Sequence, residues 1–143
     1  MLKVMFLCTG NSCRSQMAEG LAKRLGEGFI EPFSAGLIPA GVNPYAIRVM
    51  EEIGIDITGQ QSKSIDEELL RQMDIIITLC GNAEASCPMT PPEIKRLHWP
   101  IDDPVGTVGT GEEMLKEFRR ARDEIKTKIE EFLEEVKNVQ KGS

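Results

Sequence analysis

Apolar residues occur along the chain in short runs that alternate with stretches of helical periodicity. The runs from Leu2 to Leu7 and from Ile75 to Leu79 are almost continuously apolar, which is typical of parallel strands buried on both faces. Residues 29–35 and 95–99 predict two further strands. Pro32 lies inside the 29–35 segment and cannot donate to a sheet ladder, so it predicts an edge strand.

Amphipathic helices are predicted between these strands. Met17, Leu21 and Leu25 recur at four-residue intervals, and residues 44–53 carry a second apolar face that Gly54 ends.

Two capping-box patterns predict where further helices begin. Ser64 and Glu67 would open a short helix, and Thr110 and Glu113 a long terminal one. The terminal helix has one apolar stripe, which we expect to pack on the core: Met114, Phe118, Ala121, Ile125, Ile129, Phe132 and Val136.

Strands that alternate with helices predict an α/β fold with a parallel sheet covered by helices on both faces. The length of 143 residues suits one domain, which we expect over residues 1–139 with a frayed tail at 140–143. Ligands bind such sheets beyond the carboxyl ends of the strands. Cys8 and Cys80 each follow a buried strand, so both are expected at that edge.

Composition narrows the range of functions. The chain is 41% hydrophobic and 28% charged, and it shows neither a membrane-length apolar run nor a signal-peptide pattern, so we expect a cytoplasmic protein that does not bind membranes. The formal net charge of −6 argues against nucleic acid as a partner. A small anion would have to be bound locally, by backbone N–H groups and a few cations.

Four cysteines, at positions 8, 13, 80 and 87, allow several interpretations. A secreted disulfide framework does not fit a chain without a signal peptide. The spacings do not match the short pairs that structural zinc prefers, and we expect no metal. Catalytic or redox thiols remain, and the alternative is inert buried cysteines.

The segment that follows the first strand is rich in glycine, asparagine and serine and leads into a predicted helix. Small residues let successive N–H groups turn inward and form a nest for a tetrahedral oxyanion, to which the helix N-terminus adds its dipole. That positive field would favour the reactive thiolate of Cys8. Arg14 can present a planar fork to two oxygens, and Ser15 can donate to the sulfur. The residues predicted to bind the oxyanion are Thr9, Gly10, Asn11, Ser12, Cys13 and Arg14.

This C-x5-R-S motif near the start of the chain resembles the phosphate loop of the low-molecular-weight protein tyrosine phosphatase family. The resemblance implies a flavodoxin-like fold with a four-stranded parallel sheet, Cys8 as nucleophile and Arg14 as anion clamp. The family carries its general acid as an Asp before Pro, which maps onto Asp103, while Asp102 is the nearest rival and a simple Asp-Pro turn the alternative.

A phosphatase needs one thiol, and this chain offers more. Cys80 leaves a central strand at the same edge as Cys8, and Cys87 follows in the pattern TLC-x6-CP. If Cys8 captures arsenate, a second thiol can attack its sulfur and expel arsenite, and a third can take over the disulfide. A helix over residues 80–87 would hold their ends about 10.5 Å apart, beyond the roughly 7 Å a disulfide allows, so we expect rearrangement on oxidation.

The motifs CTGNSCRS, SAG, TLC, CP, HW and DDP are together similar to the thioredoxin-coupled arsenate reductases, a branch built on the phosphatase fold. The resemblance implies Cys80 and Cys87 as second and third redox thiols and thioredoxin as external reductant, with no bound cofactor. We expect a monomer with weak phosphatase activity.

Some members of that branch hold potassium near the loop through Asn, Glu, Ser and Asp. Asn11, Glu19 and Ser34 match three of these positions, but Lys63 stands at the fourth. Its ammonium either replaces the ion and holds Asn11, or faces solvent. The resemblance gives Cys13 no required role.

Two rival functions remain. A tyrosine phosphatase with extra cysteines would have aromatic residues after Asp-Pro to line a tyrosine slot, where this chain has Val105, Gly106 and Thr107. A phosphate sensor or carrier would need the anion loop but neither Asp103 nor the later cysteines. His98 and Trp99 are expected to be structural.

Overall fold

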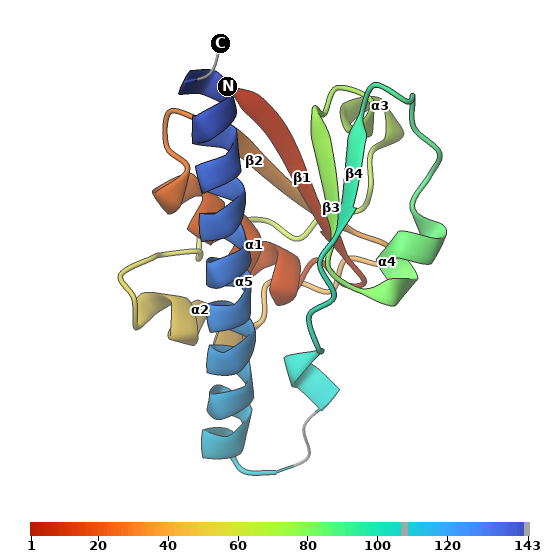
Figure 1. Cartoon of the computed structure of the whole chain (residues 1–143). Coiled ribbons are helices and arrows are strands. Elements are labelled where there is room, and N and C mark those ends of the chain that lie inside the picture. Colours follow the sequence, from red (N-terminus) through yellow and green to blue (C-terminus); the bar gives the residue numbers. More distant parts are fainter. Residues whose placement is uncertain (107–108, 142–143) are drawn as a thin grey trace.

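The computed structural model describes residues 1–106 and 109–141 (Figure 1). Within these ranges the strands form a parallel sheet in the order β2-β1-β3-β4, which is the flavodoxin-like order expected from the sequence. The elements are β1 (Leu2–Cys8), α1 (Arg14–Leu25), β2 (Ile30–Gly36), α2 (Pro44–Glu51), α3 (Glu67–Leu70), β3 (Ile75–Thr78), α4 (Gly81–Ser86), β4 (Lys95–His98), the 3-10 turn η1 (Pro104–Gly106) and α5 (Gly111–Lys141).

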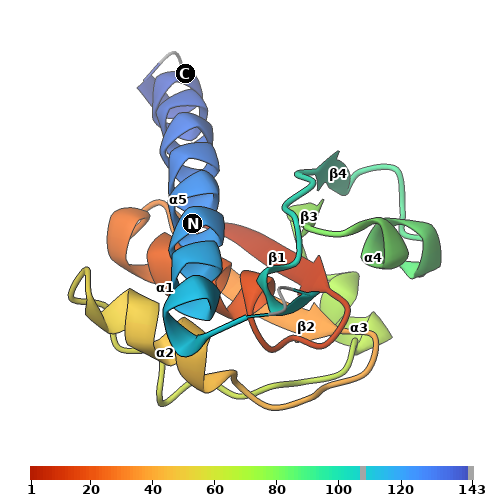
Figure 2. The ribbon, with the colours of Figure 1, turned by 90° about the horizontal axis from the view of Figure 1, so that it is seen from below.

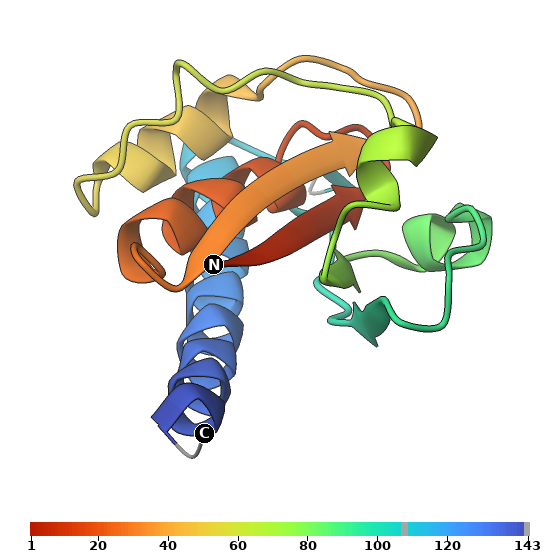
Figure 3. The same cartoon turned by 90° about the horizontal axis from the view of Figure 1, so that it is seen from above.

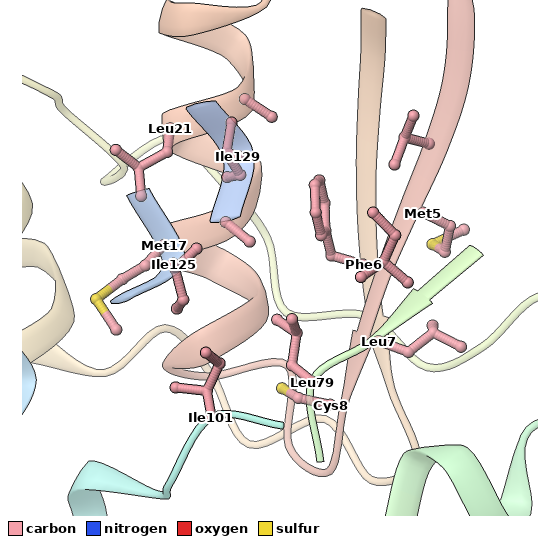
Figure 4. Packing of buried hydrophobic residues seen from close by; sticks show 14 of the residues in the cluster. Met5, Phe6, Leu7, Cys8, Met17, Leu21, Leu79, Ile101, Ile125 and Ile129 are labelled. Carbon is pink, nitrogen blue, oxygen red and sulfur yellow. The ribbon is translucent and has the colours of Figure 1, made fainter. Parts of the chain in front are cut away.

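Helices lie on both sides of the sheet. α1 and α5 pack together over one face with α2 beside them, while α3 and α4 lie on the other side (Figures 2 and 3). Figure 4 shows Met17 and Leu21 of α1 and Ile125 and Ile129 of α5 in the layer beside Phe6 of β1. All five side chains are fully buried. The apolar stripes of the two helices therefore form the core, as their spacing predicts.

The strands agree with the sequence pattern to within one residue at each end. β2 is an edge strand, as Pro32 predicts, because β1 is its neighbour on one side. β1 and β3 are central and almost wholly buried, which explains their continuous apolar runs.

One predicted helix start is wrong. Asp66, rather than Ser64, caps α3: its carboxylate accepts hydrogen bonds from the backbone N–H groups of Glu68 and Leu69 at 3.0 and 3.3 Å. Ser64 is instead drawn into a backbone bridge beside Gly36 at the end of β2. Both residues can cap a helix, and the bridge to the sheet decides between them.

The terminal helix begins as predicted, because Thr110 Oγ1 accepts a hydrogen bond from the N–H of Glu113 at 3.3 Å. It extends to Lys141, two residues beyond the end at 139 expected from the sequence. Residues 142 and 143 of the expected tail lie outside the described part of the chain, as does Thr107 after the Asp-Pro pair. No helix in the described ranges is long and apolar enough to cross a membrane.

Candidate active site

The loop between β1 and α1 turns its carbonyl groups outward. The carbonyls of Thr9, Gly10 and Ser12 accept hydrogen bonds at 2.9 to 3.0 Å from backbone N–H groups of the segment 38–43. In a trans peptide the next N–H points opposite to its carbonyl, so the amide groups of this loop turn inward. The arrangement is the nest for an anion that the sequence predicts.

Asn11 and Gly36 bring the loop into close contact with the end of β2. Asn11 has a positive φ of 45°, a conformation that asparagine tolerates better than most residues. A Cβ on Gly36 would lie 2.5 Å from the Asn11 nitrogen, so only glycine allows the loop to pack there. The SAG motif thus has a steric role, supporting the loop from below.

A chain of hydrogen bonds directs a proton toward Cys8. The backbone N–H of Lys63 donates to Asn11 Oδ1 at 2.7 Å, which orients the amide so that Nδ2 donates to Ser15 Oγ at 2.8 Å. Ser15 Oγ lies 2.9 Å from Cys8 Sγ. Because its oxygen already accepts from Asn11, the hydroxyl proton is free to point at the sulfur, where it stabilises a thiolate.

Arg14 is the first residue of α1, and its side chain is held toward the loop around Asp103. Its Nη1 donates to the Ile101 carbonyl at 2.9 Å, and its Nη2 lies 3.7 Å from Asp103 Oδ2. Cys13 occupies the N-cap without a side-chain cap bond, and the first turn carries no acidic residue. The helix N-terminus therefore keeps its positive field and N–H groups for a ligand.

These groups line one open cavity of about 380 Å³ that contains Cys8, Arg14 and Asp103. Asp103 is half exposed, and its Oδ1 accepts the N–H of Val105 at 2.9 Å. Asp102 lines a neighbouring cavity beside Cys80 and not the one that holds Cys8. The placement favours Asp103 over Asp102 as the proton donor.

Cys80, the predicted second redox thiol, lies beside the anion loop. Cys80 Sγ is 3.2 Å from Thr9 Oγ1 and caps α4 by accepting the N–H of Ala83 at 3.4 Å. Cys87 is the residue after the last turn of the same helix and is partly exposed. The two thiols therefore lie at opposite ends of α4, the helical arrangement considered from the sequence.

Burial raises the pKa of two of the thiols, Cys13 and Cys87. Burial is the main reason that the pKa of Cys13 rises from its ordinary 9.0 to about 12, so this thiol stays protonated at neutral pH. Cys13 lines the cavity as an inert thiol. Burial also keeps the pKa of Cys87 above its ordinary value, and Glu84 adds to that effect, although the Arg96 guanidinium offsets part of that rise.

The side chain of Lys63 extends toward the buried carboxylate of Glu19. Its ammonium lies 3.9 Å from Glu19 Oε1, the oxygen to which Ser34 donates at 2.6 Å. The ammonium also donates to the Gln61 carbonyl, and the side chain is 41% exposed. The backbone N–H of Lys63, and not its ammonium, donates to Asn11. The expectation that the ammonium holds Asn11 is therefore wrong.

Two contacts were missed from the sequence. Thr9 was assigned only to the anion nest, and its hydroxyl contact with Cys80 spans 71 positions. Glu84 on α4 was given no role, yet it bonds to Thr78. A polar residue one position after Cys8 and an acidic one four after Cys80 were the available signals. Trp99 packs against Phe6 and Phe132, as expected for a structural residue.

The chain matches the family described as low molecular weight phosphotyrosine protein phosphatase over residues 3–141. The chain belongs to this family. Two curated relatives named arsenate reductase, from Bacillus subtilis (strain 168) and Halalkalibacterium halodurans, are 52% and 53% identical to it over 132 residues. In each case the match covers 92% of this chain and 94% of the relative.

Solved structures of arsenate reductases and of a tyrosine phosphatase share the fold. An arsenate reductase in the phosphate binding state is 41% identical, with a TM-score of 0.78 over 95% of this chain and 99% of that chain. The thioredoxin-dependent arsenate reductase of Corynebacterium glutamicum is 26% identical, with a TM-score of 0.79 over 97% of this chain and 63% of that chain. A low molecular weight protein tyrosine phosphatase from T. tengcongensis is 27% identical, with a TM-score of 0.77 over 94% of this chain and 98% of that chain. The family and the fold class predicted from the sequence are confirmed.

Proposed function

We propose that this chain is an arsenate reductase that works through Cys8, Cys80 and Cys87 and is regenerated by thioredoxin. The observation that carries the proposal is the position of Cys80, whose sulfur lies 3.2 Å from the hydroxyl of Thr9, the neighbour of Cys8. A family phosphatase needs only one thiol, the cysteine of the anion loop. Here a second thiol borders that loop and a third follows at the far end of one short helix.

In the first step the Cys8 thiolate attacks arsenic and one oxygen departs as water. The loop N–H groups and Arg14 stabilise the negative charge of the arsenate, and Asp103 supplies the proton for the departing oxygen. The Ser15 hydroxyl, 2.9 Å from the Cys8 sulfur, is placed to donate a hydrogen bond to the attacking thiolate. The product is a covalent adduct in which Cys8 sulfur is bonded to As(V).

In the second step the Cys80 thiolate attacks the Cys8 sulfur. The S–S bond forms, the S–As bond breaks, and its electron pair stays on arsenic, which leaves as arsenite. Cys87 then attacks Cys80, so that a Cys80–Cys87 disulfide forms and Cys8 departs as a thiolate. Two thiols have lost two electrons and arsenic has gained them, and a thioredoxin dithiol returns the protein to its starting state. A cytoplasmic location would supply that reductant.

Phosphatase activity is the second candidate, because family membership and the Cys8 cavity both favour it. The segment after Asp103 argues against tyrosine phosphate as the main substrate. Pro104 and Val105 stand there, and the Val105 side chain is exposed and too small to stack against a phenyl ring. We therefore propose slow hydrolysis of small aryl phosphates as a side activity of the same loop.

The deciding experiment measures arsenate-dependent NADPH oxidation with thioredoxin and thioredoxin reductase. We expect turnover in the unmodified protein and its loss in Cys80→Ser and Cys87→Ser. Cys13→Ser is the matched control and should retain turnover, because the Cys13 thiol stays protonated and only its backbone serves the nest. Unmodified protein without turnover, or full turnover in both serine variants, would overturn the proposal.

The phosphatase alternative is tested on the same variants with p-nitrophenyl phosphate. Slow hydrolysis that survives Cys80→Ser and Cys87→Ser but is lost in Cys8→Ser is expected for a side activity. If hydrolysis of this substrate proves faster than arsenate reduction, the phosphatase becomes the main function.

A further inference from the structure

A buried hydroxyl at the end of β3 joins α4 to the sheet. Thr78 is 1% exposed, and its Oγ1 lies 2.6 Å from Glu84 Oε2 on α4 and 2.9 Å from His98 Nδ1 on β4. Its third neighbour is the Leu97 carbonyl at 3.3 Å. We call Thr78, Glu84 and His98 the clasp.

The direction of the hydrogen bonds in the clasp follows from proton counting. Thr78 has a single hydroxyl proton, and both the carboxylate and the Leu97 carbonyl can only accept one. The carboxylate contact is shorter and charge-assisted, so the proton lies toward Glu84. His98 Nδ1 must then donate to the Thr78 oxygen, because two lone pairs facing each other at 2.9 Å would repel. The clasp therefore runs from His98 through Thr78 to Glu84 and holds the proton of His98 on Nδ1.

Glu84 is placed between the two redox thiols. It belongs to the six residues of α4 that separate Cys80 from Cys87. Seven steps of a helix span about 10.5 Å, whereas the Cα atoms of a disulfide lie within about 7 Å of each other. A Cys80–Cys87 disulfide cannot form while α4 stays helical, and unwinding α4 carries Glu84 away from Thr78.

We infer that Glu84 is a positioning residue that holds α4 in its helical, reduced form through Thr78, and that the clasp opens when the Cys80–Cys87 disulfide forms. The inference rests on the relay proposed above. When the clasp opens, the Thr78 hydroxyl loses its carboxylate acceptor and turns to Leu97 or to His98. The constraint on His98 is then released, so the tautomer of His98 reports the state of α4.

The clasp predicts how easily the disulfide forms. Losing a hydrogen bond to a charged acceptor changes an equilibrium constant by about tenfold. Removing it from the reduced form should shift the dithiol–disulfide equilibrium toward the disulfide by about tenfold, which is about 30 mV for a two-electron couple. Alanine favours helix more than glutamate does, so loss of helix propensity cannot explain such a shift in Glu84→Ala.

The first experiment equilibrates the full chain in glutathione buffers and maps the disulfides by alkylation and mass spectrometry. Glu84→Ala and Thr78→Val should each shift the equilibrium about tenfold, and the double variant should shift no further than either. Thr78→Val leaves the charge of Glu84 beside Cys87, so it separates the clasp from any direct effect on that thiol. Thr78→Ser should restore the original value. Glu93→Ala, an exposed carboxylate before β4, should leave it unchanged.

The second experiment reads the ring nitrogens of His98 by NMR in the reduced protein. The proton is expected on Nδ1 in the unmodified chain and in Glu93→Ala, and the preference should be lost in Glu84→Ala and Thr78→Val. A proton on Nε2 of His98 in the unmodified reduced protein overturns the clasp. The clasp is also overturned if Glu84→Ala and Thr78→Val leave the dithiol–disulfide equilibrium unshifted, or if their two shifts add in the double variant. Unmodified protein that never forms the Cys80–Cys87 disulfide refutes the relay, while the tautomer still tests the clasp.

Discussion

Thr9 Oγ1 lies 3.2 Å from Cys80 Sγ, so the residue after one cysteine contacts the other across two neighbouring strands. β1 and β3 are paired in parallel, so both strands end at the same edge of the sheet. The contact ties the anion loop to the N-cap of α4. It therefore joins the site that captures the oxyanion to the thiol that would reduce it.

Thr9→Val tests this contact, since valine keeps the shape and the backbone N–H but removes the hydroxyl. Losing one hydrogen bond of about 1 kcal/mol should slow arsenate turnover about fivefold. Hydrolysis of p-nitrophenyl phosphate requires Cys8 but not Cys80 or Cys87, so its rate should stay near the original value. Equal losses in both reactions would show that Thr9 serves the nest and not Cys80.

Gly36→Ala should disturb the anion loop, because the added Cβ would lie 2.5 Å from the Asn11 nitrogen and the obstacle is backbone. We expect a loss of about 1–3 kcal/mol in unfolding free energy, as for other overpacked sites, and weaker binding of phosphate. Urea denaturation and phosphate titration measure the two effects.

Gly81→Ala is the matched control for that variant. In the described part of the chain, nothing beyond the adjoining residues and the backbone of α4 lies within 4 Å of a Cβ built on Gly81. The residue opens α4, where alanine favours helix. Stability should hold or rise. If the two variants behave alike, close packing beneath the loop is not the cause.

Cys13 should be the slowest of the four thiols to react with iodoacetamide. Only the thiolate reacts, and a pKa of about 12 leaves little of it at pH 7. Its alkylation rate should rise about tenfold per pH unit up to pH 10 and beyond, as measured by peptide mapping. Rapid labelling of Cys13 at pH 7 would contradict the assignment of an inert thiol.

Glu52 should stabilise the fold in a pH-dependent way. Hydrogen bonds from Arg119, then from Arg122, lower its pKa from 4.5 to about 2. A lowered pKa means that the stabilisation is complete above pH 4.5 and is lost as the pH falls toward about 2. Glu52→Gln should be less stable than the parent at pH 7, with a difference that shrinks below pH 4.5 in thermal unfolding.

Glu51→Gln serves as its control, because Glu51 is the exposed last residue of α2 and directly precedes Glu52. Its unfolding curve should follow that of the parent at each pH. A Glu52→Gln difference that stays constant down to pH 2 would exclude the ion pairs as its source.

Much of the site could be predicted because its signals are local. The nest around Cys8 is contiguous in sequence, and strand and helix on either side follow from the spacing of apolar residues. The choice of Asp66 over Ser64 as the cap of α3 could not be predicted, since both residues suit the role. Only the bridge between Ser64 and Gly36 separates them.

The amino-acid sequence by itself determined the family, the order of the elements, the anion loop and the cysteines available to it. Tertiary structure decided which of these groups meet. It brought Thr9 to Cys80, placed Asp103 and not Asp102 in the cavity of Cys8, and joined Glu84 to His98 through Thr78. The physical reason is one of range: helix and strand periodicity depends on near neighbours, whereas these contacts exist only once the sheet has packed.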